Sequence, residues 1–376
     1  MTLDPRTLLA DLVAIDSVSS KSNQPMLDTL EPVVKQLGFI TERQPSGPGK
    51  ANLIARRGSG DSGGLALIGH TDTVPYDPAW SEALKLTERD GNLYGRGACD
   101  TKGFIACALA AASQVEATGS VPLWLIFTAD EEIGCLGAKA MEKAGAVHPA
   151  FAIVGEPTQL QPIHGGKGYC TAEILVRGQE GHSAYPDRGT SALAGARLFL
   201  DGLDRLQEQL RQEGEAGFSP TFTTLNVGLL TSGKAKNVVP GETRFTLEWR
   251  PPPSQAPSRV TDALDAVAAH VRERHPRLTV QVDVQREDRG FVTPAGSRVV
   301  RFLAEREQRE SATIPFGTEA PQLIALGAET VVFGPGDIRV AHQTGEHVPL
   351  AHLARATETL AAAIRAFQST STASAT

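Results

Sequence analysis

Short apolar runs alternate with helical patterns through the first half of the chain. The runs at 65–68, 121–129 and 151–155 are nearly continuous and rich in branched or aromatic residues, which is typical of buried strands in a parallel sheet. The segments between them, 103–117 and 131–145, have helical patterns. This order predicts a β-α-β-α-β arrangement in which helices cover a mostly parallel sheet.

The pattern changes at about residue 168. Strand-like YCTAEILVRG is followed by a long helical pattern, two strand patterns, a second helical pattern and the strand-like LTVQVDV. This β-α-β-β-α-β order is that of a ferredoxin-like α+β domain. The α/β pattern returns after residue 286. We therefore expect a discontinuous α/β catalytic domain of residues 1–167 and 287–376, with a mostly parallel mixed sheet, and an inserted ferredoxin-like lid and dimerisation domain of residues 168–286.

Length and composition agree with two globular domains. The chain has 376 residues, of which 41% are hydrophobic and 21% charged, whereas single cores stop growing near about 250–300 residues. No apolar run approaches the roughly 20 residues that span a bilayer, and the first residues lack a secretory signal pattern, so we expect a cytoplasmic location. The four cysteines have no paired spacing, which predicts reduced thiols. The polar tail FQSTSTASAT is expected to fray.

The charge balance restricts the partners of the chain. A net charge of −7 argues against nucleic acid or an anionic membrane, because both require a basic surface. We therefore expect a small-molecule partner, no nucleic acid and no membrane.

Two motifs resemble known catalytic or phosphate-binding motifs, but the residues in or around them do not fit those functions. GDSGG, residues 60–64, is similar to a nucleophile elbow, but a polar segment precedes it and a strand pattern follows it. GLLTSGKA, residues 228–235, is similar to a phosphate-binding loop, but Ala235 occupies the position of the Ser or Thr that binds magnesium. We interpret both segments as turns between strands.

Histidines and carboxylates recur where the predicted apolar strands end. In open α/β sheets, this edge forms the ligand crevice. Two imidazoles and three carboxylates exceed what one tetrahedral ion uses, so the pattern predicts a dinuclear site, and the lack of thiolates favours zinc, cobalt or manganese. These ligands would be drawn from the recurring residues His70, Asp72, Asp100, Glu131, Glu132, Glu156 and His342, of which not every carboxylate is a ligand.

Seven motifs carry a resemblance that extends, in order, over nearly the whole chain: GHTDTVP, GRGACDTKG, TADEEIG, GEPT, GHSAYPDRG, GTEAP and AHQTGEHV. They resemble the dinuclear zinc amidohydrolases and peptidases that include acetylornithine deacetylase, succinyl-diaminopimelate desuccinylase, aminoacylases and glutamate carboxypeptidases. GEPT, GTEAP and AHQTGE are most similar to the acetylornithine deacetylase branch. The resemblance implies a deacylase of N-acyl amino acids, most closely N-acetyl-L-ornithine in arginine biosynthesis. A desuccinylase, an acetylcitrulline deacetylase and a dipeptidase or carboxypeptidase remain alternatives.

The resemblance also implies how the residues bind two divalent metal ions. Asp100 bridges the ions, His70 and Glu156 bind one of them, and Glu132 and His342 bind the other.

Further roles follow from the same resemblance. Asp72 orients His70, and Glu131 is the general base that takes a proton from the attacking water and delivers it to the departing amine. The peptide bond between Asp100 and Thr101 is implied to be cis.

The inserted domain contributes its own candidates. The resemblance implies that His182 polarises the scissile carbonyl in the partner subunit's site of a homodimer, and that Asn237 and Arg250 bind the α-carboxylate of the substrate. Glu319 either meets a cationic substrate side chain or is a surface-loop carboxylate. The weaker substrate-binding candidates are Lys167, Thr318 and Glu319.

Overall fold

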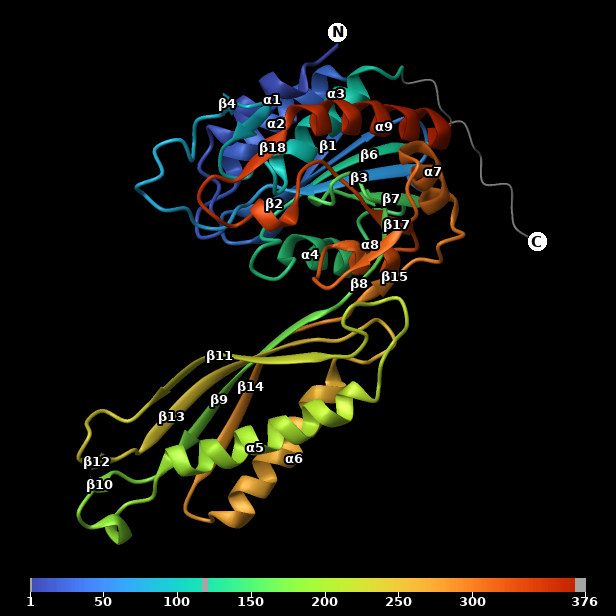
Figure 1. Cartoon of the computed structure of the whole chain (residues 1–376). Helices are drawn as coiled ribbons and strands as arrows, with labels where there is room; N and C mark the ends of the chain where they lie inside the picture. Colours follow the sequence, from blue (N-terminus) through green and yellow to red (C-terminus); the bar gives the residue numbers. More distant parts are fainter. Residues whose placement is uncertain (1, 117–120, 369–376) are drawn as a thin grey trace. The chain divides into compact units, whose positions relative to one another are not determined.

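The computed structural model describes residues 2–116 and 121–368, so residues 369–376 of the polar tail lie outside the description. The chain forms two compact units (Figure 1). The first unit comprises Met1–His164, Thr293–Ala312 and Thr318–Thr376, and the second comprises Gly165–Val292 and Thr313–Gly317.

A mixed sheet forms the centre of the first unit, with the strand order β1-β2-β6-β3-β7-β17. Neighbours from β6 to β17 are parallel, whereas β1 and β2 are antiparallel additions at one edge. All six residues of β3 and all six of β6 are buried, which explains their continuous apolar runs. The bounds are β1 (Ile40–Gly47), β2 (Lys50–Arg57), β3 (Leu65–His70), β6 (Leu123–Thr128), β7 (Phe151–Val154) and β17 (Glu329–Val332).

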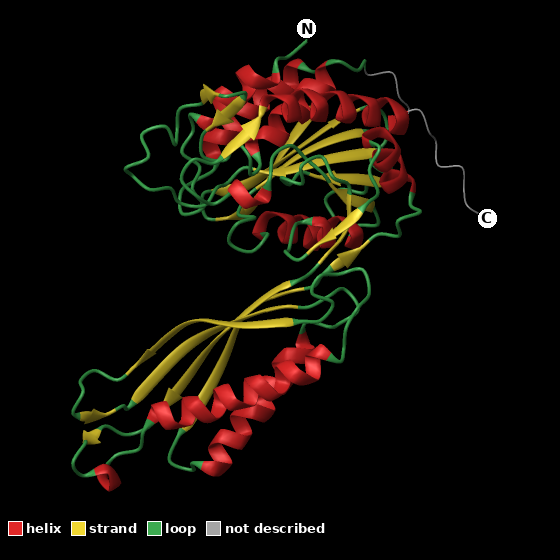
Figure 2. Cartoon of the chain, in the orientation of Figure 1, coloured by secondary structure: helices red, strands yellow, loops and turns green. Residues whose placement is uncertain are grey.

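Helices cover both faces of this sheet (Figure 2). On one face α3 packs against α1 and α9, and on the other α4 packs against α8. Because α3 lies between the sheet and other helices, every residue from Lys102 to Ala112 is buried. The helices are α1 (Pro5–Val13), α2 (Gln24–Gln36), α3 (Lys102–Ser113), α4 (Leu136–Ala144), α7 (Arg298–Glu307), α8 (Ala320–Ala325) and α9 (Leu350–Gln368), with a short 3-10 helix at Ile338–Val340.

The helix predicted over 131–145 begins later than expected. In the structure α4 starts at Leu136, and residues 131–135 form a turn in which the backbone N–H groups of Gly134 and Cys135 donate to the carbonyl of Glu131. Glu131 and Glu132 therefore lie on a loop after β6 and not in the first turn of a helix.

The remaining strands of this part of the chain are short. A three-stranded sheet has the order β18-β5-β4, with β4 (Thr87–Arg89), β5 (Asn92–Tyr94) and β18 (His347–Pro349). Beside β17, β8 (Ile163–Gly166) pairs with β15 (Phe291–Val292) and with β16 (Ala312–Ile314). The chain passes between the two units within β8, just after β15, within β16 and again after Gly317.

The second unit has the predicted β-α-β-β-α-β order. Its four-stranded antiparallel sheet runs β11-β13-β9-β14, and α5 and α6 lie on one face (Figure 2). Side chains alternate along β13 between buried and half-buried positions, so the helix-covered face forms the core. The bounds are β9 (Tyr169–Arg177), α5 (Ala192–Arg211), β11 (Thr224–Ser232), β13 (Glu242–Arg250), α6 (Ser258–Arg274) and β14 (Thr279–Asp288).

The first excluded motif is a turn between strands, but the second is only partly one, because Gly228–Ser232 form the end of β11. Residues 60–64 lie between β2 and β3, and the segment after Ser232 leads from β11 toward β12 (Val238–Val239) and β13. No helix among the described residues is long and apolar enough to span a membrane.

Candidate metal centre and active site

The predicted metal ligands lie at one edge of the central sheet. His70 ends β3, Glu132 follows β6, and Glu156 follows β7. Asp100 immediately precedes the residue that caps α3, and His342 lies in the loop after β17. Because β6, β3, β7 and β17 are parallel neighbours, their carboxyl ends carry these side chains toward the same crevice.

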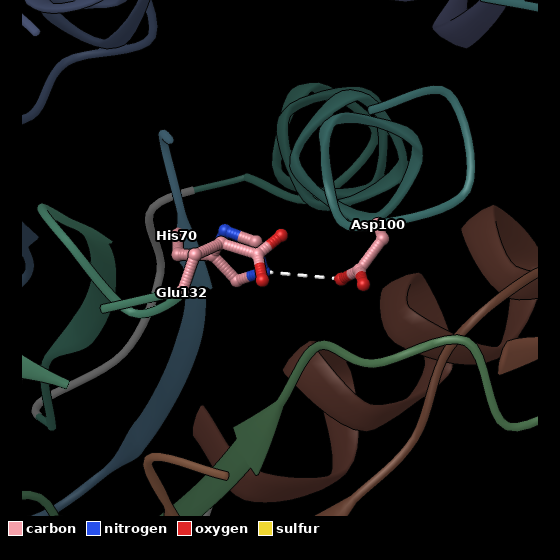
Figure 3. Close-up of side chains that lie close together, drawn as sticks. All are labelled: His70, Asp100 and Glu132. Carbon is pink, nitrogen blue, oxygen red and sulfur yellow. Dashed lines mark hydrogen bonds and ion pairs between the residues drawn. The ribbon is translucent and has the colours of Figure 1, made fainter. Parts of the chain in front are cut away.

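Asp100 lies between two imidazoles. Its Oδ1 is 3.1 Å from His70 Nε2, and its Oδ2 is 3.1 Å from His342 Nε2. His342 Nε2 is also 3.1 Å from Glu132 Oε2. Ligand atoms of His70, Asp100 and Glu132 all lie within 4.8 Å of one another (Figure 3). A carboxylate whose two oxygens face different imidazoles has the geometry needed to bridge two metal ions.

The donor set fits divalent cations. Burial, and then the neighbouring charges of Asp100 and Glu131, raise the pKa of the Glu156 carboxyl well above its usual range. Burial also raises the pKa of Glu132, and Oε1 of Glu132 is buried without a hydrogen-bond partner among the described residues. Carboxylates packed this closely repel one another, and bound cations would neutralise them.

His70 is oriented for metal binding by Asp72. Nδ1 of His70 is 2.9 Å from the Asp72 carbonyl and 3.7 Å from its carboxylate, so the backbone carbonyl of Asp72 is the closer partner. With Nδ1–H donating to this carbonyl, Nε2 is the ring nitrogen that faces Asp100 and could bind a metal. The Asp72 carboxylate instead accepts hydrogen bonds from the backbone N–H of Glu131 (3.0 Å), the backbone N–H of Glu132 (3.3 Å) and Ser19 Oγ (2.7 Å).

Glu131 lies buried beside the candidate metal ligands, and this environment shifts the pKa of its carboxyl. Burial raises the pKa of its carboxyl to about 8, with His70 opposing the shift and Glu132 adding to it. The Cys135 thiol donates to Oε1 of Glu131 at 3.5 Å. A carboxylate poised in this way, beside a metal centre, is suited to general acid–base chemistry near neutral pH.

Sequence analysis missed Glu346, which holds the loop of Asp100, the predicted bridging ligand. Its Oε1 accepts from the backbone N–H of Cys99 and of Asp100, both at 3.0 Å, and Arg96 Nη1 donates to its Oε2 at 2.6 Å. Glu346 lies in the same AHQTGEHV motif as His342, so its position in that motif was the available signal. The Asp100–Thr101 peptide bond in the clamped loop is cis, as the resemblance implied.

Glu319 is not a surface-loop carboxylate. The residue is 1% exposed, and Thr128 Oγ1 donates to Oε2 at 2.8 Å while Oε1 has no partner among the described residues. Burial raises the pKa of Glu319 to about 7, an effect that His70 opposes. Thr318 Oγ1 accepts from the backbone N–H of Ala320 at 3.2 Å, at the start of α8.

In the second unit, His182 and Asn237 lie close together. Strand β10 (Gly181–His182) pairs with β12, placing His182 opposite Val238. The backbone N–H of Ser183 donates to the Asn237 carbonyl at 3.0 Å. The His182 side chain is exposed, and its Nδ1 accepts from the backbone N–H of Ala184.

Arg250 and Lys167 lie at the other end of this unit's sheet. The Arg250 guanidinium lies 4.3 Å from the centroid of the Tyr169 ring, and Lys167 Nζ donates to the Phe222 carbonyl at 2.6 Å. Burial lowers the pKa of Lys167 to about 8. Because β13 spans nine residues, Arg250 is about 26 Å from the β12 end of the strand. Asn237 and Arg250 of one chain therefore lie toward opposite ends of β13.

Comparison with known proteins identifies the family. The model of peptidase family M20/M25/M40 matches residues 66–366. The chain belongs to this family. It is 52% identical over 369 residues to an acetylornithine deacetylase from Myxococcus xanthus, covering 96% of this chain and 97% of that protein. This M20 family member is a metal-dependent amide hydrolase.

Two solved structures share the fold of this M20 family member. An M20 family metallo-carboxypeptidase from Sulfolobus solfataricus has a TM-score of 0.79 at 18% identity and covers 97% of this chain and 99% of its own. A dinuclear metal-binding peptidase of the M20 family from Bacillus subtilis has a TM-score of 0.70 at 14% identity, with 97% and 98% coverage.

Proposed function

We propose that this enzyme hydrolyses N-acetyl-L-ornithine to ornithine and acetate in arginine biosynthesis in the cytoplasm. The observation that carries the proposal is the 52% identity, over 96% of the chain, to a protein named acetylornithine deacetylase. The presence of every expected metal ligand and of the base at one sheet edge supports an active enzyme over a binding protein that has lost its chemistry. We assign zinc as the metal, with cobalt or manganese as substitutes.

In the proposed reaction, a water oxygen bonds to the acetyl carbon and the C–N bond breaks. Two divalent ions held by the His and carboxylate ligands would polarise the carbonyl and acidify the water. Glu131 accepts the proton of the attacking water and delivers it to the departing nitrogen. Asp72 fixes His70 and the backbone of Glu131, while Arg250 pairs with the substrate α-carboxylate.

Buried Glu319 is our candidate for the substrate's ammonium group. Its Oε1 has no partner among the residues that the structure describes, and its carboxylate lies close enough to His70 for the imidazole to lower its pKa. A cationic side chain distinguishes ornithine from citrulline, so Glu319 would favour acetylornithine over acetylcitrulline.

A substrate panel with metal analysis tests this function. We expect two metal ions per chain, and the highest kcat/KM for acetylornithine when it is compared with acetylcitrulline, succinyl-diaminopimelate and simple dipeptides. A chelator should abolish turnover, and zinc or cobalt should restore it. A clear preference for another member of the panel would reassign the substrate, and inhibition by a serine-directed phosphonate with indifference to chelators would overturn the metal mechanism.

We further propose a homodimer formed through the second unit. Strand β11 is an edge of its sheet, and it exposes Leu229 and Leu230 by 69% and 44%. Exposed apolar edge strands pair readily with another strand. His182 and Arg250 lie at opposite ends of one chain's sheet, which supports a site that combines Arg250 with His182 of the partner subunit.

Mixing two inactive variants tests the shared site. Glu131→Gln and His182→Ala homodimers should each have little turnover, but their mixture should recover activity, because one hybrid site then holds an intact base and an intact histidine. Activity is measured after subunit exchange has been demonstrated with differently tagged chains. No recovery despite exchange would place His182 in its own chain's site or outside the reaction.

A further inference from the structure

The loop that carries Glu131 adopts a backbone conformation that its own sequence does not favour. Asp130 has φ +56° and Cys135 has φ +52°, both in the left-handed region that residues other than glycine rarely adopt. Such conformations persist when surrounding structure holds them in place. The loop's internal hydrogen bonds from Gly134 and Cys135 to Glu131 close the turn but do not attach it to the rest of the domain.

Lys50 attaches this loop to β2. Its Nζ lies 2.5 Å from Oδ1 of Asp130, and the side chains of Lys50 and Asp130 are only 10% and 8% exposed. The same ammonium donates to the Ser19 carbonyl at 2.8 Å. A buried pair of opposite charges is sensitive to the loss of either partner, because the remaining charge is left without compensation.

Ser19 attaches the same loop through Asp72. Ser19 Oγ donates to Oδ2 of Asp72 at 2.7 Å, and the Asp72 carboxylate accepts the backbone N–H groups of Glu131 and Glu132. Lys50 therefore holds the residue before the base by its side chain, while Ser19 fixes the carboxylate that holds the backbone of the base itself. Ser19 and Lys50 both precede the segment 66–366 that the family model matches.

We propose that Ser19 and Lys50 are positioning residues that fix the Glu131 carboxylate for proton transfer. The inference rests on the proposed function, in which Glu131 is the base. Proton transfer requires heavy atoms within about 2.6–3.2 Å, and a displacement of about 1 Å in an active site costs up to about 100-fold in rate. A loop held from outside by Lys50 and by the Asp72 carboxylate has little freedom to move by that amount.

Steady-state kinetics of Lys50→Met test the proposal. We expect kcat to fall about 10-fold to 100-fold, with KM changed less than about twofold and two metals still bound per chain. Lys50→Arg, which retains the charge, should restore most of kcat. Lys21→Met is the matched control, because Lys21 also pairs with an aspartate, Asp16, but is exposed, and its kcat should equal that of the unmodified enzyme.

A second variant separates positioning from general stability. Ser19→Ala deletes one hydroxyl and should lower kcat in the same way, so it decides the question if Lys50→Met does not fold. In a Glu131→Gln background, neither change should lower the residual rate further, because the group they position is already absent. An unchanged kcat in Ser19→Ala, an equal loss in the Glu131→Gln background, or a loss of bound metal would overturn the proposal.

The assay uses whichever N-acyl amino acid the unmodified enzyme hydrolyses best. Failure of acetylornithine as substrate therefore counts against the proposed function alone. Failure of the kcat pattern on the preferred substrate counts against the positioning role alone.

Discussion

Replacing Glu131 by glutamine should lower kcat by about 10²–10⁴-fold, the contribution typical of a general base. The amide has the shape of the carboxylate but cannot accept the proton of the attacking water. Because the backbone N–H of Glu131 donates to Asp72, the loop should keep its conformation in the variant. Single-turnover and steady-state rates, with metal content measured on the same samples, give the result.

The Glu131→Gln variant is compared with a control variant at a distant glutamate. Glu305→Gln, at an exposed position on α7, makes the same chemical change far from the chemistry and should leave kcat unaltered. Near-normal turnover of Glu131→Gln with both metals bound would remove Glu131 from the mechanism.

Asp100→Ala should reduce bound metal from two ions per chain to one or none and should abolish detectable turnover. The Asp100 carboxylate is the group that faces both His70 and His342, so its removal deprives both ions of a ligand at once. Burial alone would raise the pKa of Asp100, but hydrogen bonds from His342 and His70 lower it below the usual range, which keeps the carboxylate charged. Titration calorimetry with zinc and elemental analysis after dialysis measure the effect.

Asp61→Ala is the control for this change, because Asp61 is an exposed aspartate in the connection between β2 and β3. Its metal content should equal that of the unmodified enzyme. If Asp100→Ala retains two ions with unchanged affinity, the bridging assignment is wrong.

Local patterns predicted the fold and the sheet edge at which the candidate metal ligands gather. The apolar runs that became β3 and β6 are continuous because both faces of the sheet are covered, and this property is visible without any long-range information. The candidate ligands follow those strands in the sequence, so their position at the sheet edge was also predictable from local patterns. The β-α-β-β-α-β order of the second unit was predictable for the same reason.

Contacts between distant segments were not predictable from such patterns. Residues 131–135 have a helical pattern, but the Asp72 carboxylate takes up the N–H groups of Glu131 and Glu132, and α4 starts only at Leu136. Glu346 acts on the loop of Asp100 across about 250 residues of sequence, a separation that no periodicity encodes. The distance between Asn237 and Arg250 was not predicted, because it depends on the length of β13, the strand that ends at Arg250.

The first unit consists of segments that lie before and after the second unit in the sequence. This order constrains when the enzyme becomes active during its synthesis. Strand β17 and His342 follow Gly165–Val292 in the chain, so a ribosome completes most of the second unit before it adds the last metal ligand. Domains generally fold as units while the chain emerges. The second unit can therefore fold first, while the nascent first unit holds an incomplete set of ligands. Hydrolytic activity that depends on His342 is therefore expected only after Gly165–Val292 has been translated.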